Sequence, residues 1–178
     1  NWWNAGFNGF WVDVAVLDTG VDVTHPALSI DAENVARTFI SQDFTSSGTT
    51  DDTNGHGTHV AGIIASSDST YKGVAPGVDL LINAKHLGGV TSDTLAALDW
   101  AITNPTDGAE ILSNSWGCGS NSFTCSDYQN FCFSKADGET YYATKYIDTS
   151  IDYYDILSVN AAGNEGLCGT YSLPSPAD

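Results

Sequence analysis

The sequence of 178 residues has no methionine and only five lysines and arginines in total. A chain without an initiator methionine is expected to be a processed product or a fragment. The shortage of basic residues argues against nucleic-acid binding, which needs positive side chains to neutralise phosphates. No apolar run is long enough to cross a bilayer, and no charged-then-apolar secretion signal stands at the start. We therefore expect neither a nucleic-acid-binding protein nor a membrane span.

Acidic residues dominate the charge of the chain. The 22 Asp and Glu residues give a formal net charge of −17 at pH 7. One interpretation is a solvated acidic surface, suited to solubility or to a salty medium; the other is a set of calcium-binding loops with clustered carboxylates. Hydrophobic residues make up 42% and charged residues 15%, which indicates a globular chain. The length suits one domain or a piece of one.

The four cysteines form no C-x-x-C pair, so a zinc centre is not expected. Three of them are spaced seven residues apart in a polar stretch. An even number in such a stretch suggests disulfides and an oxidising compartment, although free buried thiols remain the alternative. Three pairings are open. The residues are Cys118, Cys125, Cys132 and Cys168.

Short β-branched runs alternate with helical patterns along the chain. We expect strands at about 12–17, 35–40, 78–84, 109–115 and 156–162, and helices at about 56–65, 92–102 and 139–152. Ser92 is the expected N-cap of the second helix. Residues 41–55 are expected to form a polar loop, and residues 117–138 an irregular insert. The alternation predicts an α/β fold with a parallel, helix-covered sheet, in which ligands gather beyond the carboxyl ends of the strands.

The expected helices show apolar residues at helical spacing. Val60, Ile63 and Ile64 would share one face of the first helix. Tyr146 and Ile151 would share one side of the third helix, together with Tyr142. We expect these faces to pack on the sheet.

Three polar side chains lie at or just after expected strand ends. Asp18 follows the first strand, where a lone Asp before Thr-Gly is also a common turn residue. His56 stands between two glycines, which would leave room for a substrate beside an imidazole able to transfer protons; a structural histidine is the alternative. Asn164 follows the last strand and can donate its amide to a developing oxyanion, or it can cap a helix or turn.

Taken together, these segments resemble the motifs of the subtilisin-like serine proteases. Residues 14–22 (VAVLDTGVD) resemble the aspartate motif, 54–62 (NGHGTHVAG) the histidine motif, and 161–166 (AAGNEG) the oxyanion-asparagine motif. Residues 73–77 (GVAPG) are similar to a further recurrent segment. Order and spacing agree from about residue 11 to 168. The resemblance implies a three-layer α/β fold with a mostly parallel open sheet and helices on both faces, of which residues 1–178 would be an incomplete part.

The resemblance also implies a role for each residue. Asp18 would orient His56 and stabilise the imidazolium, and His56 would move the nucleophile's proton to the leaving amine. Asn164 would donate a hydrogen bond to the tetrahedral oxyanion. A segment after the fourth strand would pair with the extended substrate, and small residues after the fifth would line the primary specificity pocket. These residues are Ser115, Trp116 and Gly117 for the first, and Ala161, Ala162 and Gly163 for the second. An ordinary core aromatic is the alternative for Trp116.

The family's Gly-Thr-Ser motif, which opens a helix of small residues, is absent. Ser172 follows a similar Gly-Thr pair but is displaced by one residue, and Pro174 and Pro176 disfavour the helix. We expect the nucleophilic serine to lie outside this chain, on a continuation or a second chain. The 178 residues alone would then be inactive, and unstable because apolar faces lack their cover.

The leading hypothesis is a secreted serine endopeptidase that acts on proteins or peptides and is completed by the remainder of its peptidase domain or a second chain. The alternatives are a non-catalytic subtilase-like peptide-binding or assembly component, and a plain α/β binding module that leaves the glycine-flanked histidine unexplained. No cofactor is expected for the chemistry. Structural calcium is expected from the family, with Asp43, Asp51 and Asp52 as a candidate cluster and a solvated acidic loop as the alternative.

Overall fold

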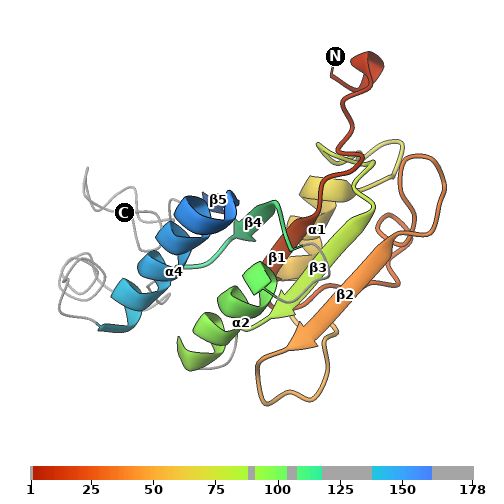
Figure 1. Cartoon of the computed structure of the whole chain (residues 1–178). Coiled ribbons are helices and arrows are strands. Elements are labelled where there is room, and N and C mark those ends of the chain that lie inside the picture. The colour runs from red at the N-terminus through yellow and green to blue at the C-terminus, as the bar shows by residue number, and fades with distance from the viewer. Residues whose placement is uncertain (1, 88–90, 104–107, 118–137, 162–178) are drawn as a thin grey trace, which may run out of the picture.

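The computed structural model describes residues 2–87, 91–103, 108–117 and 138–161. These residues form a five-stranded sheet with helices packed against it (Figure 1). The strands are β1 (Val14–Asp18), β2 (Thr38–Asp43), β3 (Leu80–Lys85), β4 (Ile111–Asn114) and β5 (Leu157–Asn160). The helices are η1 (Trp3–Ala5), α1 (His56–Ala65), α2 (Thr91–Thr103) and α4 (Gly138–Tyr154). No described helix is both long and apolar enough to cross a membrane.

The sheet is parallel throughout, with strand order β2-β3-β1-β4-β5. β1 is central, and all five of its residues are buried. Its run of small and β-branched side chains is typical of a strand covered on both faces. Asp18 is paired in register with Lys85 of β3, at the carboxyl end of the strand. The prediction of a parallel α/β fold is therefore confirmed.

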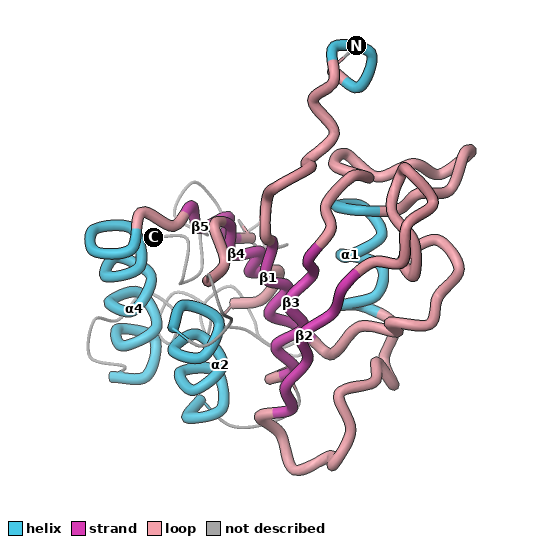
Figure 2. Tube along the Cα trace, turned by 45° about the vertical axis from the view of Figure 1, so that its right-hand side comes forward, coloured by secondary structure: helices cyan, strands magenta, loops and turns pink. Residues whose placement is uncertain are grey.

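Alternate side chains of β1 enter two separate cores. Val14 and Val16 pack with Ala61 and Ala65 of α1 on one face. Ala15 and Leu17 belong to the core on the other face, which includes residues of α2 and α4. Figure 2 shows α1 on one side of the sheet and α2 and α4 on the other. This is the expected three-layer arrangement.

Small residues, not the branched ones, form the sheet-facing stripe of α1. Gly57, Ala61 and Ala65 recur every four residues and are all buried. Ile63, which was predicted to face the sheet, is 56% exposed. The prediction was wrong because a helix that lies this close to a sheet has room only for small side chains. Val60 and Ile64 flank the stripe and are partly buried.

The apolar face predicted for α4 is also wrong. Among residues 145–154 of α4, Ile147 and Ser150 are buried, whereas Tyr146 and Ile151 are substantially exposed. Ile147 and Ser150 are each adjacent in the sequence to a predicted residue, so the buried face of α4 is rotated relative to the predicted one. α2 begins at Thr91, so Ser92 lies in its first turn and is not the N-cap.

The segment 73–75 closes the end of α1. The backbone nitrogens of Val74 and Ala75 donate to the carbonyls of Ile63 and Ile64, at 3.0 and 2.7 Å. These carbonyls would otherwise lack partners at the helix terminus. A Cβ on Gly73 would lie 2.5 Å from the nitrogen of Ser66, so glycine is required for this approach. The recurrent segment noted in the sequence thus anchors the helix that begins with His56.

Arg37 ties the same helix end to two loops. Its side chain is buried, and its guanidinium donates to four backbone carbonyls. The contact with Ala65, the last residue of α1, is 2.7 Å. The other carbonyls are those of Leu28, Ile30 and Pro76. Burial lowers the pKa of Arg37, against the opposing effect of nearby Asp31 and Asp79.

His86 is a second buried polar side chain, with 1% of its surface exposed. Its Nδ1 lies 3.0 Å from the hydroxyl oxygen of Thr94 on α2. Burial lowers the pKa of His86 to about 4, although a backbone hydrogen bond and the charge of Asp93 act in the other direction. The imidazole is therefore neutral at neutral pH.

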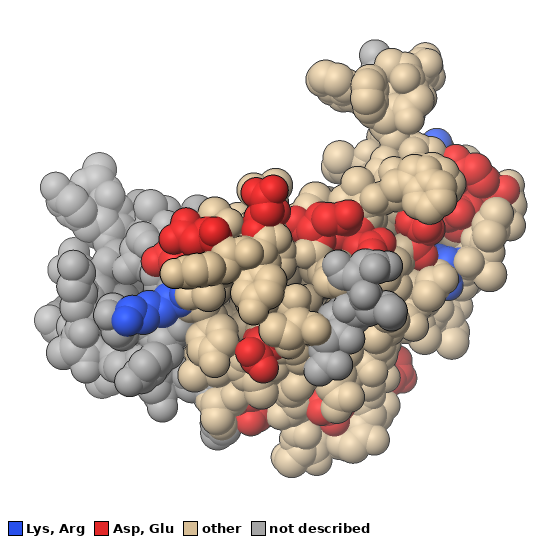
Figure 3. All heavy atoms as spheres, viewed as in Figure 1, with Lys and Arg blue, Asp and Glu red and all other residues tan. Residues whose placement is uncertain are grey.

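Acidic side chains spread over the molecular face shown in Figure 3, with few basic ones among them. Asp68, Asp99 and Asp148 are among the exposed carboxylates. This distribution agrees with the interpretation of the acidic excess as a solvated surface.

We predict that Arg37→Met destabilises the full-length protein by about 2–4 kcal/mol, because four backbone carbonyls lose a charged donor. Urea unfolding monitored by fluorescence measures this change. Lys72→Met is the control, because Lys72 is exposed. Equal stability of the two variants would contradict the prediction.

We also predict a contribution of His86 to the pH dependence of stability. The unfolded chain binds a proton at an ordinary pKa near 6.5, whereas the folded chain does so only near 4. Stability is therefore lost as the pH falls from about 6.5 to 4, by up to ~3 kcal/mol. His86→Asn should make the unfolding free energy fall less steeply across this window in the full-length protein. Parallel curves for the variant and the wild type would refute this assignment.

Candidate functional site

Asp18 and His56 meet where β1 ends and α1 begins. His56 Nδ1 lies 2.7 Å from Asp18 Oδ1, although the residues are 38 positions apart. The carboxylate is 1% exposed, whereas the side chain of His56 is 48% exposed. The backbone nitrogen of Thr19 donates to the same oxygen at 2.7 Å. The carboxylate thus favours the tautomer that is protonated on Nδ1, which leaves Nε2 able to accept a proton.

Gly57 lets the first turn of α1 lie directly against the turn that follows β1. A Cβ at this position would collide with the carbonyl oxygen of Gly20 and lie 3.0 Å from Asp18 Cβ. The expectation that both glycines clear space for a substrate therefore needs correction. Gly55 has open space around it and a φ of 97°, but Gly57 is needed for contact with the rest of the site.

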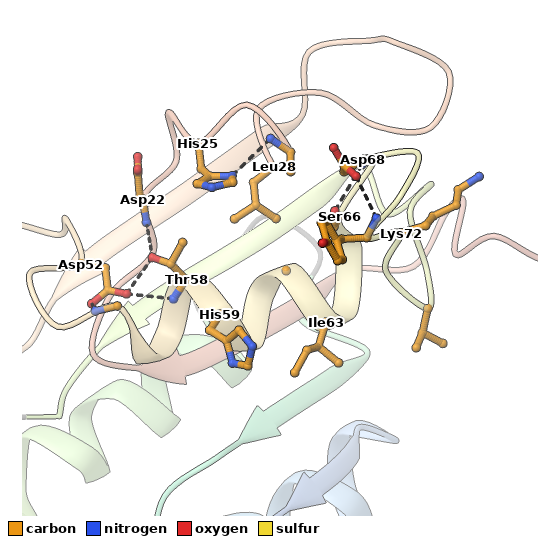
Figure 4. Close-up of a pocket in the computed structure, with 15 residues that line it drawn as sticks. Asp22, His25, Leu28, Asp52, Thr58, His59, Ile63, Ser66, Asp68 and Lys72 are labelled. Carbon is orange, nitrogen blue, oxygen red and sulfur yellow. Dashed lines mark hydrogen bonds between the residues drawn. The ribbon is translucent and has the colours of Figure 1, made fainter.

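Asp52 holds the beginning of α1 in place. Its Oδ2 accepts from the nitrogen and hydroxyl of Thr58, at 2.9 and 2.7 Å. Its Oδ1 accepts from Gly55 N, Asn54 N and the hydroxyl of Thr19. Burial alone would raise the pKa of Asp52, but these hydrogen bonds lower it to about 2. Figure 4 shows Asp52 bonded to Thr58 at the start of the helix, where a negative charge is also favoured by the helix dipole.

The loop carboxylates considered as calcium ligands already accept hydrogen bonds from the protein. Asp43 accepts from the nitrogen and hydroxyl of Thr45, from the hydroxyl of Ser47, and from Gly48 N. Asp52 is bonded as described above. Within the described ranges, no three His, Cys, Asp or Glu side chains are grouped so that they could hold a metal ion. The carboxylates of this loop therefore do not fit a calcium site.

The predicted substrate segment lies directly after β4. Ser115, Trp116 and Gly117 continue from Asn114, and the nitrogen of Ala161 donates to the carbonyl of Asn114 at 2.9 Å. The ends of β4 and β5 are therefore neighbours, as the predicted roles require. Asn164, Ala162, Gly163, the four cysteines and residues 118–137 lie outside the described residues.

His86 is a residue of this region that the sequence analysis missed. Its backbone nitrogen donates to the carbonyl of Asp18 at 3.0 Å. Its ring packs edge-on against Trp116, with centroids 5.1 Å apart and planes at 77°. A signal was available, because His86 stands just after a predicted strand, at the edge where ligands gather.

Two hollows flank the start of α1. One, of about 530 Å³, is lined by Thr19 and Asn54, which neighbour the Asp18–His56 pair. The other, of about 850 Å³, runs along the outer side of α1 (Figure 4). Its lining includes Ile63, whose exposed side chain adds apolar surface to this side of the helix.

Comparisons with known proteins agree with this geometry. Residues 11–178 match the Subtilase family. Subtilisin Savinase of Lederbergia lenta is 34% identical over 178 residues, which are 97% of this chain and 54% of that protein. Subtilisin BL of Lederbergia lenta is 38% identical over 169 residues, covering 92% of this chain and 51% of the relative. The Major intracellular serine protease of Bacillus subtilis (strain 168) is 46% identical over 89 residues, which are 49% of this chain and 27% of that protein.

Solved structures give the same result for the fold. A cold adapted subtilisin-like serine proteinase has a TM-score of 0.57 and 26% identity, covering 89% of this chain and 48% of that one. The Aeromonas sobria serine protease in complex with its chaperone has a TM-score of 0.61 and 25% identity, covering 89% and 26%. The chain spans about half or less of the length of these relatives. With the family's motifs, its parallel α/β fold and the match over residues 11–178, the chain belongs to the subtilase family of serine proteases.

Proposed function

We propose that these residues belong to a serine endopeptidase in which Asp18 and His56 are the acid and base of an Asp-His-Ser triad. The observation that carries this proposal is the 2.7 Å contact between a buried Asp18 carboxylate and a half-exposed His56 imidazole. A buried acid fixes the tautomer, and an exposed edge of the ring leaves Nε2 accessible to a nucleophile.

The chemistry follows from this arrangement. Nε2 of His56 takes the proton of a serine hydroxyl as its oxygen attacks the substrate carbonyl carbon. The carbonyl oxygen becomes the oxyanion, to which Asn164 would donate a hydrogen bond. The imidazolium then gives its proton to the leaving amine as the peptide C–N bond breaks and an acyl-enzyme ester remains. His56 then takes a proton from a water molecule as the water oxygen attacks the ester carbonyl carbon. The imidazolium gives this proton to the serine oxygen as the bond between that oxygen and the acyl carbon breaks.

The nucleophile would come from a part of the protein outside residues 1–178. An open apolar face of the sheet supports this view. Leu157 and Val159 of β5 are 58% and 52% exposed. Leu157 is in register with Ile111, which packs in the core on the α1 side. The uncovered face therefore adjoins α1, and the remainder of the domain would cover it while bringing the serine to His56.

The compartment and the bound ions are part of the same proposal. Relatives include both an intracellular protease and the Minor extracellular protease Vpr of Bacillus subtilis (strain 168), so membership of the family does not decide the compartment. An even number of cysteines, three of them in a polar stretch, supports secretion and disulfide formation. Structural calcium remains a prediction for parts of the protein other than the 43–52 loop. No cofactor is needed for the proton transfers described.

A non-catalytic peptide-binding or assembly component is the second candidate. It would use the segment 115–117 to pair with an extended peptide without cleaving it. The Asp18–His56 contact favours the peptidase, because peptide binding alone does not require an oriented imidazole.

The full-length protein should react with a serine-directed phosphonate and carry the adduct on a serine outside residues 1–178. His56→Ala should reduce kcat for peptide hydrolysis by ~10²–10⁴-fold or more, since general base catalysis is lost. Mass spectrometry of the adduct and steady-state kinetics are the measurements. A full-length protein that binds peptides but is neither labelled nor active would favour the binding component.

We further expect Gly57→Ala to lower kcat/KM in the full-length protein by ~10²-fold or more, because the added methyl group pushes His56 away from Asp18. Gly48→Asn is the matched control, since Gly48 has a φ of 73°, which Asn tolerates, and nothing lies within 4 Å of its Cβ position. Wild-type activity in Gly57→Ala would show that the close approach is not needed.

A further inference from the structure

We propose that His86 is a positioning residue that holds Trp116, and through it the segment 115–117, in place for extended substrates. This inference rests on the proposed function, in which that segment pairs with the substrate backbone. His86 itself touches neither substrate nor nucleophile in this scheme.

The backbone and ring of His86 connect three parts of the fold. Its backbone nitrogen donates to the carbonyl of Asp18 at the end of β1, at 3.0 Å. Its Nδ1 lies 3.0 Å from the hydroxyl oxygen of Thr94 on α2, which fixes the rotation of the ring. The ring then meets Trp116 edge-on, at 5.1 Å between centroids. These contacts fix the position of Trp116, after β4, relative to β1 and α2.

Burial holds the His86–Trp116 contact rigid and keeps the imidazole of His86 uncharged. His86 is 1% exposed, and its lowered pKa of about 4 keeps the ring uncharged across the neutral range. Nε1 of Trp116 is buried and has no hydrogen-bond partner among the described residues. Buried polar atoms without partners are uncommon and ask for an explanation. A flat ring oriented by Thr94 offers Trp116 an edge-to-face contact, which a leucine at position 86 would not provide.

Trp116 stands between Ser115 and Gly117, so a shift of its side chain moves the backbone on both sides. An extended peptide would form backbone hydrogen bonds along this segment, as an added strand does. A short substrate that reaches only His56 and the nucleophile would not. Loss of the His86–Trp116 contact should therefore weaken the binding of long substrates and leave the proton transfers intact.

The test compares two variants of the full-length protein on two substrates. His86→Asn keeps a polar group within reach of Thr94 but removes the ring, and His86→Phe keeps a flat ring against Trp116. The substrates are a peptide with several residues before the scissile bond and a chromogenic amide of a single residue. We expect His86→Asn to raise KM for the long peptide by about tenfold with kcat within about twofold, and to leave the short amide unchanged. In His86→Phe, KM for the long peptide should stay close to the wild-type value.

A double-mutant cycle identifies Trp116 as the intermediary. Trp116→Ala should raise KM for the long peptide as His86→Asn does, and the double variant should be little worse than either single one. Additive effects would overturn the proposal, as would equal losses on the long and the short substrate.

A readout independent of catalysis separates this inference from the proposed function. Hydrogen exchange at the backbone amides of residues 115–117 should become faster in His86→Asn and stay near the wild-type rate in His86→Phe. If the wild type hydrolyses neither substrate, the proposed function fails while this measurement still tests the link from His86 to the segment. Unchanged exchange in His86→Asn would overturn the inference in either case.

Discussion

The close approach of the first turn of α1 to the turn after β1 is the constraint on which the site depends. Gly57 lies against Gly20, and a Cβ on Gly57 would collide with the carbonyl oxygen of Gly20. Asp52 joins the two segments from the side, since its carboxylate accepts from Thr19 and Thr58 together. The 2.7 Å contact of His56 with Asp18 follows from this packing, because the two side chains begin from backbones that are already held together.

Rigid anchoring at both ends of α1 makes this placement durable. The first turn is fixed by Asp52, and the last turn by the segment 73–75 and by Arg37. Between them, the stripe of small residues lies flat on the central strand. Catalytic geometry tolerates errors of only about half an ångström, so a histidine at the end of such a helix is better placed than one on a loop. The exposed edge of His56 can then be left open to solvent without loss of its orientation.

Hydrophobic periodicity predicted the approximate positions of the five strands and their parallel arrangement, and the resemblance of short motifs predicted the Asp18–His56 pair, because both kinds of signal encode local structure. It did not predict which face of α1 is buried. Helical spacing alone cannot show whether a stripe of Ala and Gly or the branched residues beside it faces the sheet. The distance between helix and sheet determines which of the two sets fits there. The cap formed by Asp52 and the position of His86 were missed for a related reason: both depend on partners more than five residues away, such as Thr58 for Asp52 and Trp116 for His86.

The described residues divide the proposed reaction into two unequal tasks. Orientation of the base needs only contacts that this part of the chain makes by itself, from β1, α1 and the loop that carries Asp52. Delivery of a nucleophile needs an element that approaches His56 from its exposed edge. Exposed apolar side chains such as Ile63 on α1 and Leu157 and Val159 on β5 are unfavourable in water. Burial of these side chains would favour the docking of the element that carries the proposed nucleophile.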